Sequence, residues 1–411
     1  MRKHIPAALL LATISLQAAS IPQVSSPEDV GLSRDRLTRI REAVDRHIES
    51  QQIAGAVTLV ARKGRIAHFE AHGRMDREAN KPMAKDAIFR IWSMSKPVAA
   101  IAILMLIEEG KVRLNDPASK FIPEFKSLKV AVAQAAVQEG MPSFYTIPAT
   151  REITVQDLLT HVSGLGSGPA SRSETQRIPA DARRSLASFI PRLSATPLDF
   201  QPGSRWTYSP AAAFDTLGRI VEVASGHTFD RFLRDRLFAP LEMKDTFFYP
   251  GESHWPRIVT AYHRDGGTLK KTENPNRLVS ETYFSGGGGL LSTAEDYAQL
   301  AGMLANGGQL NGKRYLGVKT VELMSSVFVP ETFQGRKTGE GFGLGVRVIT
   351  DPIAVGHWVS TGSYGWDGAY GTHFWIDPKE KLTGILMIQT DNPNRQLDRD
   401  FEAAVMQSIV E

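Results

Sequence analysis

The chain has 411 residues, of which 42% are hydrophobic and 22% charged, with a formal net charge of +4 and no cysteine. The length fits one large domain or two interleaved lobes, and the composition argues against a disordered chain or an integral membrane protein. The lack of cysteine excludes disulfides, thiolate metal ligands and a cysteine nucleophile.

Residues 1–20 have the pattern of a secretory signal peptide. Arg2 and Lys3 precede an apolar stretch, Ile5–Leu16, and the small residues Ala18–Ser20. We expect cleavage near the end of this leader and export to the periplasm or the medium. The alternatives are an uncleaved anchor helix, which the short apolar stretch disfavours, and a buried N-terminal helix. The leader holds two basic and no acidic residues, so its removal lowers the charge from +4 to +2. No nucleic-acid partner is expected, and no membrane contact after cleavage.

The first elements after the leader are predicted to be a helix and a hairpin. A helix is expected from about Ser33 to Gln51. Residues 53–64 and 65–74 are rich in β-branched side chains and flank a turn at Lys63 and Gly64, which is typical of two paired strands. From about residue 87 to 327 helical periodicity dominates, with Pro- and Gly-rich loops between the helices.

Strand-like segments return near the end of the chain, in "GFGLGVRVIT", "THFWID" and "KLTGILMIQT", before a last helix from about Leu397 to Val410. We therefore predict an α/β (α+β) fold with an antiparallel sheet built from both termini and flanked by helices. Residues 21–411 form a single domain, with an α/β lobe at about 30–86 and 328–411 and a mostly helical lobe at about 87–327. A ligand site is expected where the lobes meet.

Ser93 and Lys96 form an S-x-x-K sequence directly ahead of the apolar run "AAIAILMLI". Residues three apart on a helix share a face, so the amine can reach the hydroxyl. The helix dipole and desolvation penalise a protonated lysine, so we expect Lys96 to be neutral and to act as a base. A serine nucleophile needs such a base. The alternative is that Ser93 or Ser95 caps the helix while Lys96 is solvated.

Other chemistries have weaker support. The chain contains no G-x-S-x-G, which disfavours an α/β-hydrolase nucleophile. Gly307–Arg314 imitates a phosphate loop, but Arg314 replaces the magnesium-binding Ser or Thr, so we interpret this segment as a helix end and a turn. The ten histidines show neither H-E-x-x-H nor close pairing with carboxylates. No metal and no cofactor are therefore expected.

Several segments, in order, resemble the serine β-lactamase and penicillin-binding-protein superfamily, and more closely its class C-like branch that includes the family VIII esterases. They are "SMSK" (93–96), "LLTHVSGLG" (158–166), "PGSRWTYSP" (202–210), "PLEMKDTFF" (240–248), "GGGGLLSTAEDYA" (286–298) and "GWDGAYGTHFWIDP" (365–378). The resemblance covers most of residues 30–395. It implies that Tyr208 is the second-motif tyrosine, which with Lys96 moves the proton of Ser93 to the leaving group and later activates water.

The resemblance also implies a third motif, for which two placements compete. Ser360–Gly362 mimics the K-T-G of β-lactamases, whereas Trp366–Gly368 resembles the W-G-G of the esterases. The following segment aligns with a strand and favours the second placement. Ala369 is then the expected partner of Ser93 in the oxyanion hole, because such N–H donors stabilise the charge of the tetrahedral intermediate.

Trp366, Gly368 and Ser209 are the expected substrate-binding residues. Asp367 departs from the esterase pattern and receives no role. The glycines of Gly286–Gly289 are expected to permit close backbone approach near the cleft, and this structural role is enough to explain them. Three histidines, His161, His357 and His373, are expected to be non-catalytic.

Two departures from the superfamily bear on the substrate. Pro210 replaces the asparagine of the second motif, and the third motif lacks the cationic lysine, so an anionic β-lactam loses its charge-assisted partner. Ester cleavage requires less acid catalysis, because an alkoxide leaving group needs less protonation than an amine. We expect an exported serine hydrolase, most closely a carboxylesterase on small or medium acyl esters. The alternatives are a β-lactamase, a D-aminopeptidase or DD-peptidase, another amidase, or a catalytically silent binding protein on this scaffold.

Overall fold

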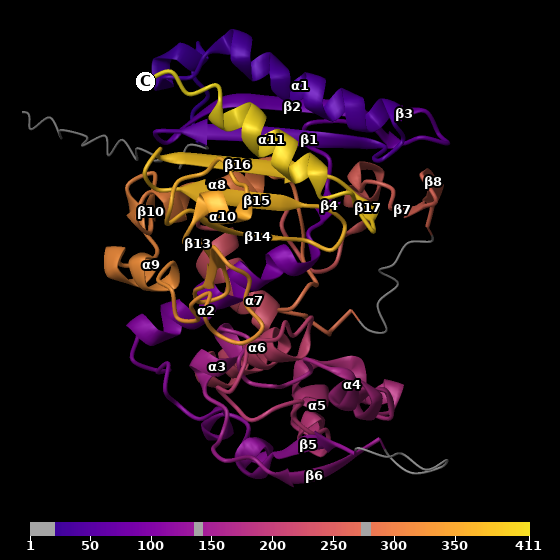
Figure 1. Cartoon of the computed structure of the whole chain (residues 1–411), viewed down its shortest axis with the longest axis vertical. Coiled ribbons are helices and arrows are strands. Elements are labelled where there is room, and N and C mark those ends of the chain that lie inside the picture. The colour runs from indigo at the N-terminus through magenta and orange to yellow at the C-terminus, as the bar shows by residue number, and fades with distance from the viewer. Residues whose placement is uncertain (1–20, 135–142, 273–280) are drawn as a thin grey trace, which may run out of the picture.

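A computed structural model describes residues 21–134, 143–272 and 281–411 (Figure 1). The predicted leader lies outside the described residues. Within them, an eight-stranded sheet has the order β12-β13-β14-β15-β16-β1-β2-β3, with antiparallel neighbours throughout. The strands are β1 (Gly55–Arg62), β2 (Arg65–Asp76), β3 (Lys81–Pro82), β12 (Glu340–Phe342), β13 (Arg347–Ile349), β14 (Tyr364–Asp367), β15 (His373–Asp377) and β16 (Leu382–Met387). The predicted fold class is confirmed.

The two ends of the chain meet at the middle of this sheet. β1 pairs with β2 on one side and with β16 on the other, in registers that join Arg62 to Arg65 and to Leu382. Lys63 and Gly64 have φ angles of 51° and 74°. These left-handed values suit a two-residue hairpin turn whose twist matches that of the strands, so the predicted hairpin is confirmed.

Helices cover both faces of the sheet. α1 (Arg34–Glu49) and α11 (Gln396–Met406) pack on one face, and α8 (Ala294–Ala305) packs on the other. Because side chains alternate along a strand, Ala56 and Val60 of β1 face the first pair of helices while Val57 and Leu59 face the opposite core. α8 lies between residues 87 and 327, so the mostly helical segment also contributes to the layer around the sheet.

The earlier helices of this segment lie in the lower half of Figure 1. They are α2 (Ser95–Glu108), α3 (Val155–Leu159), α4 (Pro169–Gln176), α5 (Leu186–Phe189), α6 (Ala212–Ser225) and α7 (Phe229–Leu233), and α9 (Val318–Met324) follows α8. α2 is buried from Ser95 to Leu106 and packs on α6. A helix that is apolar on all sides belongs in a core, so α2 is the central support of this lobe.

Short elements complete the described fold. They are α10 (Pro352–Val355) and the strand pairs β4 (Phe89–Arg90) with β9 (Leu291–Ser292), β5 (Lys129–Ala133) with β6 (Phe144–Pro148), and β10 (Gln309–Leu310) with β11 (Lys313–Arg314), together with the sheet of β7 (Tyr262–Asp265), β8 (Thr268–Lys271) and β17 (Thr390–Asp391). The segment 307–314 was expected to be a helix end and a turn. It continues into the β10–β11 hairpin because Asn311 and Gly312 both adopt positive φ. None of the described helices is long and apolar enough to cross a bilayer.

Candidate active site

Ser93 lies in a tight turn at the start of the buried helix α2. This turn, η2 (Trp92–Met94), leads directly into α2 and leaves Ser93 partly exposed. Trp92 has a φ of 46°, in the left-handed region that residues other than glycine rarely adopt. Backbone held in such a conformation is frequent at functional sites. The turn thus presents the Ser93 hydroxyl at the end of a helix fixed by its own burial.

Lys96 is wholly buried, and its amine contacts three oxygen atoms of the described residues. Nζ lies 2.7 Å from the Pro210 carbonyl oxygen, 2.6 Å from that of Gly287 and 3.2 Å from Ser93 Oγ. Carbonyls can only accept, so they take two N–H groups of the amine. The third position on the nitrogen faces Ser93, as a lone pair when the amine is neutral and as an N–H when it is protonated. The geometry allows Lys96 to take a proton from Ser93 and to return it.

Tyr208 contacts the same hydroxyl. Its phenol oxygen lies 2.6 Å from Ser93 Oγ, and Lys96 Nζ lies 4.9 Å from the centre of its ring. Ser93 Oγ therefore joins the amine and the phenol into one hydrogen-bonded unit through which a proton can pass. The structure brings together the three residues that the sequence singled out.

Asp215 on α6 is a site residue that the sequence analysis missed. Its buried carboxylate accepts hydrogen bonds from the Tyr283 hydroxyl at 2.7 Å, the Ser285 hydroxyl at 2.7 Å and the Gly287 N–H at 2.9 Å. Burial raises the pKa of Asp215, and these hydrogen bonds and the charge of Lys96 oppose that effect. Asp215 thereby fixes the backbone at Gly287, whose carbonyl oxygen holds the amine of Lys96.

Glycines let the backbone of this segment approach α6. A Cβ on Gly286 would lie 2.5 Å from the Phe214 carbonyl oxygen, and a Cβ on Gly287 would lie 2.7 Å from the Ala211 Cα. Neither backbone atom can move away as a flexible side chain could, so a larger residue would displace the Gly287 carbonyl. The expectation that these glycines permit close approach is confirmed.

The turn after β14 packs against η2. A Cβ on Gly368 would lie 2.6 Å from the Ile91 carbonyl oxygen, so only glycine fits there. The Tyr370 ring stacks on Trp92, with ring centres 5.3 Å apart and planes within 3°. Ala369 is exposed between these two contacts. The structure thus places Ala369 beside the turn that holds the hydroxyl.

Ser360–Gly362, the competing placement of the third motif, lies at the far end of β14. The Ser360 N–H donates to Asp377 Oδ2 at 2.8 Å, and Asp377 is the last residue of β15. The register pairs Asp367, at the other end of β14, with His373. Because η2 packs at the Asp367 end, the geometry favours Trp366–Gly368.

Asp367 holds the end of β14 in place. Its carboxylate accepts from Arg347 Nη1 at 3.1 Å and pairs with His373 Nδ1, while Arg395 donates to the Gly368 carbonyl oxygen at 2.9 Å. Burial acts to raise the pKa of Asp367, yet the charges of Arg347 and His373 hold it well below its usual range. The ionised carboxylate ties β14 to both neighbouring strands, which gives this residue the positioning role that the sequence did not suggest.

The sequence and the fold both have known relatives. The profile of the Beta-lactamase family matches residues 40–407. The chain belongs to the Beta-lactamase family. Among its relatives, Esterase EstB of Burkholderia gladioli is 30% identical over 391 residues, covering 86% of this chain and 90% of EstB. A putative D-alanyl-D-alanine carboxypeptidase of Escherichia coli (strain K12) is 27% identical over 413 residues, covering 92% and 88% of the two chains.

The structure of EstCE1, a hydrolase with promiscuous acyltransferase activity, shares the fold. It superposes with a TM-score of 0.76 at 26% identity, over 90% of this chain and 99% of EstCE1. The resemblance stated from the motifs is confirmed, and the protein is a serine hydrolase of the β-lactamase superfamily.

Of the expected substrate contacts of this Beta-lactamase-family site, Ser209 is buried while Trp366 borders the site. Ser209 is wholly buried, and its Oγ donates to the Leu165 carbonyl oxygen at 2.8 Å and accepts from the Ala213 N–H at 3.1 Å. With no exposed surface, this side chain does not reach a substrate, contrary to our expectation. Trp366 is partly exposed, and the centre of its ring lies 5.7 Å from that of Tyr208, so it forms a wall beside the phenol.

His161 is a buried neighbour of Tyr208. Its ring lies 4.8 Å from the Tyr208 ring, and its Nδ1 accepts from the Ser209 N–H at 3.2 Å. Burial, and then the charges of Lys96 and Arg336, lower the pKa of His161 well below its usual value. The neutral ring supports the second-motif loop from behind.

Acid should destabilise the wild type more than it destabilises His161→Gln. Below about pH 6.5 the unfolded chain protonates this histidine and the folded chain does not, so its contribution is present above that pH and is lost as the pH falls. Between pH 7.5 and 5.5 the wild type should lose about 1.4 kcal/mol more free energy of unfolding than the variant. Denaturant unfolding at both pH values measures the difference. Equal losses in the two proteins would contradict the buried, neutral assignment.

Proposed function

We propose that the protein is an exported carboxylesterase that works through an acyl-enzyme on Ser93. The observation that carries this proposal is the position of Ser93 Oγ, 3.2 Å from the Lys96 amine and 2.6 Å from the Tyr208 phenol. A serine hydroxyl is a weak nucleophile at its ordinary pKa and needs a neighbouring base to take its proton. These two groups are the bases within reach among the described residues.

In the proposed first step, Ser93 Oγ gives its proton to the pair of Lys96 and Tyr208 and bonds to the carbonyl carbon of the ester. The carbonyl oxygen becomes an anion, which the N–H groups of Ser93 and Ala369 stabilise. When the C–O bond breaks, the proton moves from the pair to the departing alkoxide. Water then gives a proton to the same pair, attacks the acyl carbon and releases the acid, and the proton returns to Ser93.

Two residues favour esters over β-lactams. Pro210 stands in place of the asparagine of β-lactamases, and its carbonyl oxygen is engaged by Lys96 at 2.7 Å. Trp366 stands in place of the cationic lysine of their third motif. An anionic lactam therefore lacks a charge-assisted partner at these positions. The name of EstB, an esterase, supports this choice, while the carboxypeptidase relative supports an amide substrate as the alternative.

Export is supported by the sequence of residues 1–20. A basic start, an apolar core and small residues near position 20 are the features that secretion machinery reads. We propose that this leader is removed and that the enzyme acts in the periplasm or the medium. N-terminal sequencing of protein recovered from a periplasmic fraction should find a chain that begins close to residue 21.

Wild-type protein should hydrolyse p-nitrophenyl butyrate with a kcat/KM about 10- to 150-fold above that for a chromogenic cephalosporin, since a lost hydrogen bond to a charged group is worth about 1.5–3 kcal/mol. Intact mass spectrometry after brief exposure to the ester should show one butyryl group per chain. Faster turnover of the cephalosporin would favour the amidase alternative. A chain that takes up no acyl group from either compound would favour the binding protein.

A further inference from the structure

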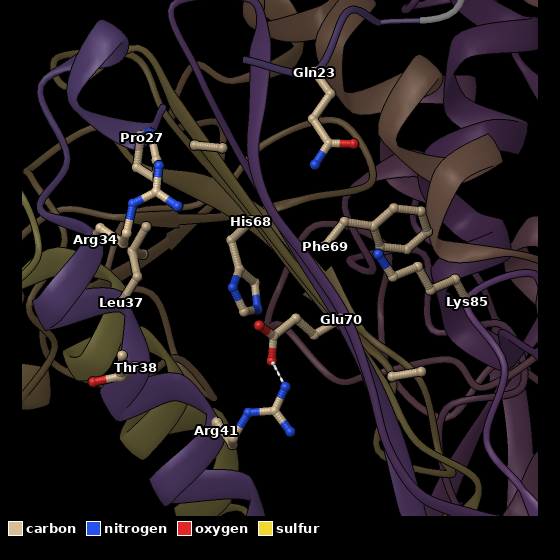
Figure 2. Close-up of a pocket in the computed structure, with 12 residues that line it drawn as sticks. Gln23, Pro27, Arg34, Leu37, Thr38, Arg41, His68, Phe69, Glu70 and Lys85 are labelled. Carbon is tan, nitrogen blue, oxygen red and sulfur yellow. Dashed lines mark hydrogen bonds and ion pairs between the residues drawn. The ribbon is translucent and has the colours of Figure 1, made fainter. Parts of the chain in front are cut away.

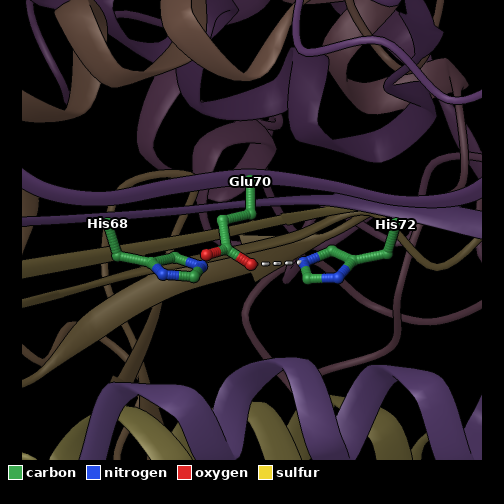
Figure 3. Close-up of side chains that lie close together, drawn as sticks. All are labelled: His68, Glu70 and His72. Atoms are coloured by element: carbon green, nitrogen blue, oxygen red, sulfur yellow. Dashed lines mark ion pairs between the residues drawn. The ribbon is translucent and has the colours of Figure 1, made fainter. Parts of the chain in front are cut away.

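β2 carries a cluster of three ionisable side chains that the acyl chemistry does not use. Its sequence His68-Phe69-Glu70-Ala71-His72 places alternate residues on one face of the strand. Figure 3 shows His68, Glu70 and His72 side by side between β2 and a neighbouring helix. One imidazole nitrogen or carboxylate oxygen of each lies within 4.8 Å of the other two. Both histidines are buried, and Glu70 is partly exposed.

Thr58 on β1 brings the two imidazoles toward one point. It pairs with Glu70 in the register, and its Oγ1 lies 2.8 Å from His68 Nε2 and 3.0 Å from His72 Nε2. Glu70 Oε2 lies 4.0 Å from the same nitrogen of His72. Both nitrogens and the carboxylate therefore border the space around one hydroxyl. Zinc binds such atoms at about 2.0–2.2 Å, so a bound ion would take the place of the Thr58 hydrogen bonds and the side chains would rotate toward it.

The donor set favours a transition metal. His68 and His72 are both buried, and each offers an imidazole nitrogen, a donor that binds metal in its unprotonated form. Two histidines and one carboxylate are typical of zinc and iron(II) sites that keep a coordination position open. Calcium and magnesium prefer ligands that are all oxygen, so these ions fit less well.

A cavity of about 580 Å³ adjoins the cluster (Figure 2). His68 and Glu70 line it from β2, and Arg34, Leu37 and Arg41 line it from α1. The cavity offers room for water or another ligand in the open position of a bound ion. Solvent reaches the cluster from this side.

Arg41 competes with a metal for Glu70. Its Nη2 lies 2.7 Å from Glu70 Oε2, but the Arg41 side chain is 57% exposed and can turn into solvent. Exposed ion pairs contribute little free energy, so a coordinated ion can replace this one. The arginine therefore weakens metal binding without preventing it.

We propose that His68, Glu70 and His72 bind one divalent transition-metal ion, for which Zn²⁺ is the probe, and that Arg41 tunes the affinity. No such site was expected from the sequence, because H-E-x-x-H is a helical spacing, whereas a strand places every second residue on one face. The expectation that histidines do not pair closely with carboxylates is wrong. The fold also pairs His47 with Asp400, His357 with Glu402 and His373 with Asp367.

The full chain, stripped with a chelator and dialysed, should take up one Zn²⁺ in competition with a chromogenic chelator. His72→Gln and Glu70→Gln should weaken binding by more than about 100-fold, since even outer-shell changes cost 10–100-fold. Arg41→Gln should tighten it by up to about fivefold, the most that an exposed ion pair is worth. His263→Gln is the matched control, because this half-exposed imidazole also pairs with a carboxylate, that of Asp391, yet lies outside the cluster.

Glu70→Gln keeps the size of a partly exposed side chain, so it tests the proposal even if a buried-histidine variant folds poorly. Thermal unfolding without metal checks the fold of each variant, and the visible spectrum of bound Co²⁺ reports nitrogen ligation. Ester hydrolysis by Glu70→Gln should equal that of the wild type, because the cluster takes no part in acyl transfer. A wild type that binds no Zn²⁺, or Glu70→Gln and His263→Gln proteins that bind it equally, would overturn the proposal.

Discussion

Ser93→Ala is expected to lower kcat/KM for p-nitrophenyl butyrate by at least about 10⁴-fold and to abolish the acyl-enzyme. The variant lacks the oxygen that bonds to the acyl carbon, and water held near Lys96 and Tyr208 is a poor substitute because it is not positioned for attack. Ser93 is partly exposed, and without its hydroxyl the Lys96 amine keeps its hydrogen bonds to the carbonyl oxygens of Pro210 and Gly287. The melting temperature should therefore change little. Intact mass and steady-state kinetics on the same preparation measure the effect.

Ser95→Ala is the matched control for this experiment. Ser95 lies two residues further along the same segment, and its buried Oγ accepts from the Leu290 N–H at 3.2 Å. Its loss leaves that donor unpaired and should cost about 1–3 kcal/mol of stability, while acylation continues. If the Ser93 variant were still acylated and the Ser95 variant were not, the nucleophile would be Ser95 and the proposed geometry would be wrong.

The strongly patterned parts of the sheet could be predicted from the sequence. β1 and β2 combine β-branched residues with a Lys63-Gly64 turn, and local chemistry alone favours a hairpin there. β14 was not predicted, because Tyr364–Asp367 is a four-residue strand that contains a glycine and an aspartate. Its pairing with β13 and β15 decides its conformation, and such partners cannot be read from a short segment.

The candidate site, too, could be predicted from the sequence only in part. Spacing placed Lys96 within reach of Ser93, and the resemblance added Tyr208. Asp215 was not identified from the sequence because its partners, Tyr283 and Ser285, lie about 70 residues further along the chain. The available signal was the acidic residue at position 215, in the middle of the mostly apolar segment "AAAFDTLGRIV". A buried carboxylate must have donors, so an acid at a core position of a helix indicates a hydrogen-bond network whose other members only the fold identifies.

Lys96→Met is expected to reduce kcat by about 10²–10⁴-fold, the contribution of a well-placed general base. Methionine has a similar length and suits the buried position, but it cannot accept the proton of Ser93. If the pair of Lys96 and Tyr208 serves both halves of the reaction, acylation and deacylation should slow together. Pre-steady-state measurement of p-nitrophenol release separates the two steps.

A purely structural role for Lys96 predicts a different result. The substitution leaves the carbonyl oxygens of Pro210 and Gly287 without their buried donor, which should cost about 1–3 kcal/mol of stability for each oxygen. A structural defect would reduce the fraction of folded enzyme and leave the rate per folded active site unchanged. Lys319→Met, at a side chain that is 89% exposed, controls for the loss of a lysine. If the folded Lys96→Met enzyme formed and hydrolysed the acyl-enzyme at wild-type rates, Tyr208 alone would have to be the base.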